Sequence, residues 1–183
     1  MAGSRSERRE KIREEFWPGE DAWTGGDPEK GWFKAPRTLP LLLGLMRSKG
    51  LTGNADPSSV YLELLSRQFG DGVVEIQNEA EHAYASGYAS TRAVRTWQEQ
   101  MKRLEALGFI KIKGIGKQAF KYILIVHPSQ VVKSLLEQNK LPEGWWDAYR
   151  DRRIQTKEPS YEERQALKAR AKIVSLGGVR KAE

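Results

Sequence analysis

The spacing of apolar residues changes along the chain, and these changes predict where helices and strands begin and end. Steps of three and four predict helices at 41–48, 56–69, 79–86, 90–107 and 128–138, and another from 160 to about 177. Alternation of apolar and polar residues predicts strands at 73–77, 109–115 and 119–126. The pattern therefore predicts an α+β fold, mostly helical, with a small antiparallel β-hairpin.

The helix predicted at 90–107 has two different sides. One side is apolar and should pack on the core, because its residues recur at steps of three and four: Val94, Trp97, Met101 and Leu104. At 3.6 residues per turn, the other side carries Arg92, Arg95, Thr96, Glu99 and Arg103, and Ser90 or Thr91 caps the helix. Arginine can donate two hydrogen bonds to guanine in the major groove, and threonine can contact bases or backbone. A solvated helix face has the same composition, so both interpretations stay open.

The two strands that follow this helix are basic. Gly114-Ile115-Gly116-Lys117-Gln118 joins them, and four lysines interleave with the apolar positions or flank the turn: Lys111, Lys113, Lys117 and Lys121. Basic side chains on a hairpin beside such a helix suit contacts to phosphate. The turn does not match a phosphate-binding loop, because no Ser or Thr follows Lys117 and it joins strand to strand.

The order helix, helix, strand, helix, turn, helix and two-stranded hairpin over residues 38–126 resembles the winged-helix superfamily of DNA-binding domains. The resemblance implies a winged helix-turn-helix whose major-groove face consists of Thr91, Arg92, Arg95, Thr96 and Glu99, flanked by Ser90 and Arg103. It places Lys113, Lys117 and Gln118 at the hairpin, which is called the wing. The loop at 49–57 and the arm before Thr38 have no counterpart in that pattern.

Three parts are expected along the chain: an N-terminal arm (1–37), a winged-helix domain (38–139) and a basic helical tail (140–183). Residues 4–16 form either a charged helix or a disordered arm, with Ile12 and Phe16 as its apolar pair. Residues 17–36 are irregular but aromatic, with Trp17, Trp23, Trp32 and Phe33. We expect this segment to be an extended arm that packs over the core like a strap; the alternative is a segment that binds a partner.

The predicted tail combines a helix start signal with a basic face. Ser160 and Glu163 have the spacing of a capping box, and Arg164, Lys168 and Lys172 share one face of the helix that follows. Such a tail could add nonspecific DNA affinity, bind a partner, or lie on a membrane surface with its thin apolar side.

Composition limits the partners and the compartment. The formal net charge of +7 favours a polyanionic partner, and the absence of cysteine excludes disulfides and thiolate metal sites. The longest apolar stretch, 39–46, is too short to span a bilayer, and charges occupy the position of a signal-peptide core. We therefore expect a cytoplasmic, nucleoid-associated protein with no membrane contact.

No catalytic pattern stands out. His82 has no second histidine four residues away, and His127 precedes Pro128 at the end of a strand. The carboxylates form no regularly spaced cluster, and nothing marks a nucleophile elbow. We expect a protein that is not an enzyme and that uses no cofactor and no metal.

Three functional hypotheses follow. The first is sequence-specific binding of double-stranded DNA by a transcriptional regulator that acts as a homodimer. The second is a plasmid or phage replication or partition accessory protein, whose aromatic N-terminal arm recruits a protein partner. The third is a winged helix used only as a protein-interaction module.

Overall fold

The computed structural model describes residues 5–22, 26–27 and 32–178 of the 183-residue chain. Its elements in chain order are α1 (Arg5–Phe16), β1 (Gly26–Asp27), β2 (Trp32–Phe33), α2 (Leu39–Met46), α3 (Lys49–Thr52), α4 (Ser58–Arg67), β3 (Val73–Glu75), α5 (Glu79–Ala85), α6 (Ala93–Ala106), β4 (Ile110–Ile115), β5 (Gln118–Ile125), α7 (Pro128–Glu137), α8 (Trp145–Thr156) and α9 (Tyr161–Gly178). The fold is α+β and mostly helical, as the sequence predicts.

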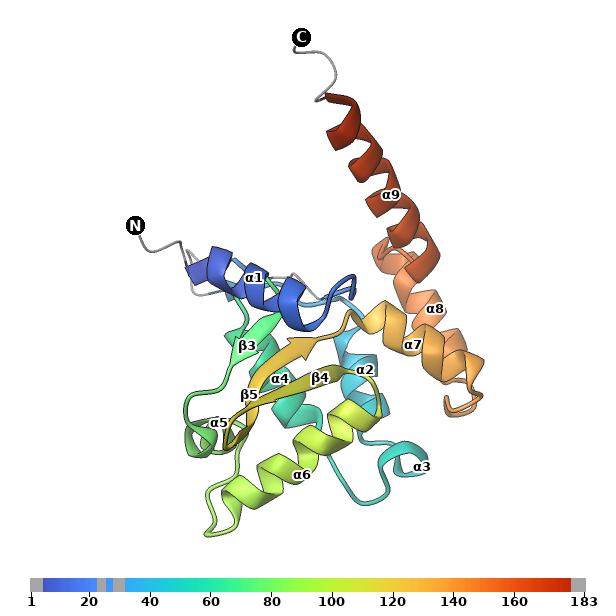
Figure 1. The fold of residues 1–183 in the computed structure, drawn as a ribbon. Coiled ribbons are helices and arrows are strands. Elements are labelled where there is room, and N and C mark those ends of the chain that lie inside the picture. Colours follow the sequence, from blue (N-terminus) through green and yellow to red (C-terminus); the bar gives the residue numbers. More distant parts are fainter. Residues whose placement is uncertain (1–4, 23–25, 28–31, 179–183) are drawn as a thin grey trace.

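β3, β5 and β4 form a three-stranded antiparallel sheet in that order, with β5 in the middle. Ile123 of β5 lies opposite Val74 of β3 and Ile112 of β4. The hairpin of β4 and β5 confirms the predicted strand pair. α1 and α6 lie on opposite faces of this sheet (Figure 1), so apolar side chains are buried on both faces.

The main core lies between the sheet and helices α2, α4, α6 and α7. Leu42, Tyr61 and Phe109 have no exposed surface, and the rings of Tyr61 and Phe109 pack edge to face with centroids 5.3 Å apart. Ile123 reaches this core from the middle strand and is also fully buried. These long-range contacts bring segments from residue 42 to residue 123 into one packed unit.

α1 covers the second face of the sheet. Ile12 is 9% exposed, and Phe16 packs on Tyr122 with ring centroids 5.8 Å apart. The sequence leaves open a charged helix or a disordered arm at 4–16, and the structure shows a helix docked through its one apolar pair. Trp17 beside it is buried and Phe33 packs on the main core, as expected of a strap over the core. Trp23 lies outside the described residues.

The core continues into α8, a helix that the sequence analysis misses. In the sequence, Pro142 indicates a connector at residues 141–146, but the helix already begins at Trp145. Tyr149 is 2% exposed and stacks on Trp145 with centroids 5.0 Å apart, and the Trp145 indole donates a hydrogen bond to the Leu41 carbonyl at 3.2 Å. The part of the chain after residue 139 is therefore packed against the domain before it.

Two of the predicted helix starts behave differently. The Ser160 and Glu163 capping box is confirmed, because each side chain accepts a hydrogen bond from the other residue's N–H, at 3.0 and 2.6 Å. Asn78 caps α5 by accepting from the Ala80 N–H at 3.0 Å. The spacing of Asn78 and Glu81 in the sequence also resembles a capping box, but Glu81 pairs with Arg67 instead of completing it.

The N-terminal segment and the C-terminal helices are fastened to each other. Asp21 is 9% exposed and accepts hydrogen bonds from Arg164 at 2.8 Å and Gln165 at 3.1 Å, and it also pairs closely with Lys168. Burial lowers the pKa of Arg164 to about 10.

A second contact of the same kind involves Thr38. Thr38 precedes Leu39 and Pro40, a sequence that indicates an N-cap, and it is the N-cap residue of α2. Its hydroxyl, however, donates to Glu158 at 2.9 Å instead of capping the helix. Both contacts join residues more than a hundred positions apart, so together they fix where α8 and α9 sit.

His127 is the N-cap residue of α7, where its ring nitrogen accepts a hydrogen bond from the Ser129 N–H at 3.2 Å. Burial, with a smaller contribution from Lys168, lowers the His127 pKa to about 4. Between this pKa and the usual value of about 6.5 the unfolded chain binds a proton that the folded protein does not, so stability falls as the pH decreases.

We expect His127 to cost about 1–2 kcal/mol of unfolding free energy between pH 7 and pH 5. His127→Asn keeps a capping oxygen and removes the titrating group, so its urea-unfolding free energy should fall less over this pH interval. Equal pH dependence of the wild type and the variant would contradict the assignment.

Candidate nucleic-acid interface

α6 is held rigidly by its apolar side. Trp97, Met101 and Leu104 have no exposed surface, which confirms three positions of the predicted apolar side. The Trp97 ring packs edge to face on Phe120 of β5, with centroids 5.5 Å apart. The polar side of α6 is thereby turned away from the sheet.

The turn between α5 and α6 sets the angle between the two helices. Gly87 lies in the left-handed region at φ +90°, a conformation that glycine adopts without a steric penalty. The Tyr88 N–H donates to the Ala83 carbonyl at 2.9 Å, which closes the end of α5. Gln98 of α6 donates to the Glu79 carboxylate at 2.6 Å and joins α6 to the start of α5.

A buried polar network fastens α5 to α4. The Glu63 carboxylate lies 3.1 Å from the His82 ring and 2.8 Å from Arg67, and the side chains of Glu63 and His82 are each 5% exposed. His82 also lies 6.0 Å from Trp97, measured between ring centroids. This histidine therefore helps to hold α4, α5 and α6 together.

The predicted start of the recognition face lies in a turn. Ser90, Thr91 and Arg92 are exposed but precede the first residue of the helix, Ala93. Ser90 accepts a hydrogen bond from the Arg92 N–H at 3.3 Å, inside this turn. The N-cap residue is therefore Arg92, one or two positions later than the predicted cap at Ser90 or Thr91, and these three side chains precede the first helical turn.

The exposed face of α6 carries a row of cations. Arg95 is highly exposed and pairs with Glu99 at 3.1 Å. Arg92, Lys102 and Arg103 are exposed and form no ion pair within the described part of the chain. Thr96 is half-buried at the edge of this face. Lys102 is an addition to the predicted set, and its position next to Arg103 and seven residues after Arg95 already places it at this face in the sequence.

The hairpin after α6 ends in a two-residue turn. Ile115 pairs with Gln118 across Gly116 and Lys117, and Gly116 has φ +57°. A Cβ atom on Gly114 would lie 3.0 Å from the Ala119 carbonyl oxygen, so a side chain here would fit only if the facing β5 backbone moved by a few tenths of an ångström. The exposed tip therefore consists of Ile115, Gly116, Lys117 and Gln118.

The four lysines of the hairpin have different partners and lie in different places. Lys113 lies 5.1 Å from the centre of the Phe16 ring at the end of α1, and Lys111 pairs with Glu20 in the segment after α1. Both lysines therefore lie on the side of the sheet opposite α6. Lys121 pairs with Glu75 at 3.1 Å. Among the described residues Lys117 has no such partner. It is the hairpin lysine left available at the tip.

The basic face predicted in the tail is largely used inside the molecule. Arg164 and Lys168 are both bound to Asp21, and the side chain of Lys172 is outside the described part of the chain. α9 projects away from the body on the side remote from α6 (Figure 1). Arg164, Lys168 and Arg170 are thus separated in space from the exposed face of α6.

Metal sites, membrane-spanning helices and similarity to known proteins were also considered. Within the described ranges no three His, Asp or Glu side chains come together as a metal site requires. Every helix in those ranges is too short or too polar to cross a lipid bilayer. Comparison of the chain with protein families, curated proteins and solved structures found no match.

Proposed function

We propose that this protein binds double-stranded DNA as a winged-helix protein, with α6 in the major groove and the tip of the β4–β5 hairpin on the backbone. The observation that carries the proposal is the exposed face of α6: Arg92, Lys102 and Arg103 are unpaired within the described residues and stand on a fully buried base of Trp97, Met101 and Leu104. Rigid cationic helices of this kind suit contacts to base edges and phosphates.

The order of elements supports the same proposal. α2, α4, β3, α5, α6 and the hairpin follow each other in the order that the winged-helix resemblance implies, with α3 inserted between the first two helices. α5, the Gly87 turn and α6 correspond to the helix-turn-helix of that resemblance.

Arg95 is available for a guanine base although it pairs with Glu99. Both side chains are mostly exposed, at 79% and 60%, and an exposed pair four residues apart on a helix contributes only about 0.3–0.5 kcal/mol. Two hydrogen bonds to guanine contribute about 1–3 kcal/mol of discrimination against other bases, so a pair as weak as that with Glu99 is no obstacle to base recognition by Arg95.

Within this proposal the biological role is transcriptional regulation by a homodimer. A single α6 offers two arginines, Arg92 and Arg95, near its N-terminal end, and so can recognise only a few base pairs. Two copies on adjacent half-sites double that number, because half-sites one helical turn apart are contacted from the same side of the duplex.

Arg95→Ala tests the recognition role. On a duplex selected from a random pool by the wild type, we expect the variant to bind about 1–3 kcal/mol more weakly, because one base contact is lost. Its unfolding free energy should stay within about 0.5 kcal/mol of the wild type, because the side chain is exposed. Fluorescence anisotropy and urea unfolding measure the two quantities.

The matched control is Arg170→Ala, which removes an exposed arginine from α9, far from α6. This variant should keep the affinity for the selected duplex. Equal affinities of wild type and Arg95→Ala for that duplex would remove Arg95 from the recognition face.

Lys117→Ala tests the tip of the hairpin. A phosphate contact carries no sequence information, so the variant should bind selected and scrambled duplexes more weakly by the same factor. The slope of log affinity against log salt concentration should become shallower by about one unit. Lys113→Ala is the comparison, because Lys113 lies over Phe16 and should change the slope less. A larger change in Lys113→Ala would contradict this assignment.

A further inference from the structure

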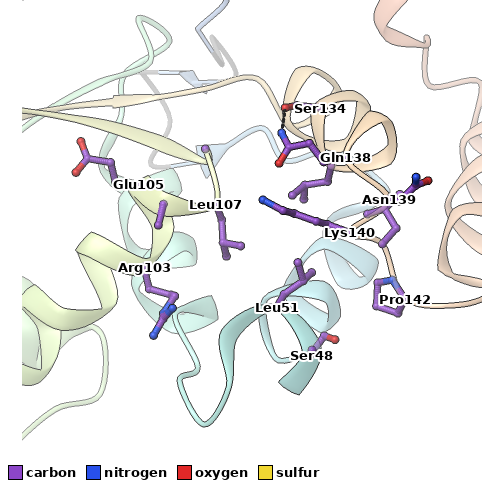
Figure 2. A pocket seen from close by; sticks show the side chains of 15 residues that line it. Ser48, Leu51, Arg103, Glu105, Leu107, Ser134, Gln138, Asn139, Lys140 and Pro142 are labelled. Atoms are coloured by element: carbon purple, nitrogen blue, oxygen red, sulfur yellow. Dashed lines mark hydrogen bonds between the residues drawn. The ribbon is translucent and has the colours of Figure 1, made fainter.

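A groove of about 650 Å³ lies at the C-terminal end of α6 (Figure 2). Arg103 lines it from α6, Ser48 and Gly50 from the segment around α3, and Asn139 and Lys140 from the end of α7. Three segments that are far apart in the sequence therefore meet beside the face that we propose for DNA. The α3 insertion, which has no counterpart in the winged-helix pattern, forms one wall of this groove.

The groove offers hydrogen-bond donors and positive charge. Lys140 extends into it (Figure 2), and neither Lys140 nor Arg103 forms an ion pair within the described residues. The acidic side chain in its wall is Glu105, which accepts a hydrogen bond from the Ile112 N–H at 2.9 Å. Lys140, Arg103 and Ser48 all line the groove, where Figure 2 shows them at separate positions around Leu51 and Leu107. Cationic and hydroxyl groups spread along a groove in this way suit successive phosphates of a backbone.

The backbone that carries Lys140 is fixed before any ligand arrives. Asn139 adopts a left-handed conformation at φ 52° after the end of α7. The Asn139 N–H donates to Leu136 at 3.0 Å, and the Lys140 N–H donates to Leu135 at 2.9 Å, which closes the helix end. The backbone of Lys140, from which its side chain extends, is therefore held in place beside the groove.

The distance along α6 indicates which part of a duplex would reach the groove. Arg92 and Arg103 lie on the same side of the helix, about 16 Å apart along its axis at 1.5 Å per residue. The major groove of DNA is only about 12 Å wide. If the N-terminal half of α6 enters the groove, Arg103 reaches the sugar-phosphate wall next to it.

We infer that the groove between α6, α3 and the end of α7 binds the phosphate backbone of the duplex beside the segment contacted by α6. This inference rests on the proposed DNA binding. It assigns the α3 insertion a function, because α3 and Lys140 extend the DNA contact surface beyond α6 and the hairpin. Lys140 attracts the phosphates by its charge, and the groove fixes the position of the backbone. Neither contact depends on the base sequence.

Lys140→Gln tests whether the positive charge of Lys140 contributes to DNA binding. On a random-sequence duplex near physiological salt, the variant should bind roughly fivefold more weakly, and its salt slope should be shallower by about one unit. Arg170→Gln, which removes one exposed charge from α9, should change neither value. If both variants lose the same affinity, the effect is one of general charge and the inference is wrong.

Affinity cleavage tests the position. The chain contains no cysteine, so Ser48→Cys provides a single attachment point for an iron–EDTA chelate in the groove. Bound duplex should be cut at backbone positions beside the segment that α6 protects. The same chelate on Gln155→Cys, an exposed site of α8, should leave the duplex intact.

The outcomes separate the two proposals. Intact DNA with labelled Ser48→Cys, under conditions where the protein is bound to the duplex, overturns the groove inference and leaves DNA binding by α6 standing. Failure of the wild-type protein to bind any duplex overturns both.

Discussion

Replacement of Trp97 by alanine is expected to lower the unfolding free energy by about 3–5 kcal/mol, the range observed for large aromatic residues in protein cores. Trp97 has no exposed surface and packs on Phe120 and His82, so its removal leaves a cavity where α6 meets the sheet and α5. α6 then loses the support that orders its exposed face. DNA binding should weaken as a consequence, although Trp97 itself cannot reach the DNA.

Urea unfolding followed by circular dichroism measures this effect, and Tyr84→Ala is the control. Tyr84 lies on α5 and is 74% exposed, so its replacement should change the unfolding free energy by no more than about 0.5 kcal/mol. A loss below about 1 kcal/mol for Trp97→Ala would mean that α6 does not depend on this core.

The second large effect is expected at Asp21, where Asp21→Asn leaves the Arg164 guanidinium without its charge partner. The two side chains are only 9% and 12% exposed, and breaking a buried ion pair from one side costs about 3–5 kcal/mol. Because the pair joins α9 to the N-terminal segment, the loss should appear mainly as release of α9. Backbone amides around Gln165 should exchange with solvent faster by more than tenfold, as a loss above about 1.4 kcal/mol requires.

The double variant Asp21→Asn/Arg164→Gln separates a buried charge from ordinary packing. With no unpaired guanidinium left, it should recover a large part of the protection that Asp21→Asn loses. Additive losses in the two single variants would show that the pair is not coupled. Arg150→Ala, which breaks an exposed pair with Asp147, should change protection in α9 little.

Short-range patterns in the sequence were sufficient to predict α6 and the β4–β5 hairpin. Trp97, Met101 and Leu104 recur at helical spacing and are all fully buried, and the glycine-rich turn gives the predicted hairpin. The same patterns failed at α8, because Trp145 and Tyr149 lie in its first half and its second half is charged and exposed. A helix that uses a few aromatic residues near one end has too little periodicity to be recognised.

The partners of the basic residues were not predictable in this way. Period-two alternation puts Lys111 and Lys113 on one face of β4, but only the position of α1 shows that they meet Glu20 and Phe16. Arg164 likewise finds Asp21 across 143 residues of sequence. Charge that looks available in a sequence can be used in tertiary contacts, which is why the candidate interface is now centred on α6, Lys117 and the groove at Lys140.

The affinity of the wild-type protein for a random-sequence duplex at increasing salt concentration tests whether the exposed face of α6 binds duplex DNA. We expect measurable binding whose log affinity falls linearly with log salt concentration, with a slope of several units, because several lysine and arginine side chains contact phosphate. Absence of any salt-sensitive affinity would contradict DNA binding by α6. It would favour a protein-interaction module, in which the exposed face of α6 binds another protein.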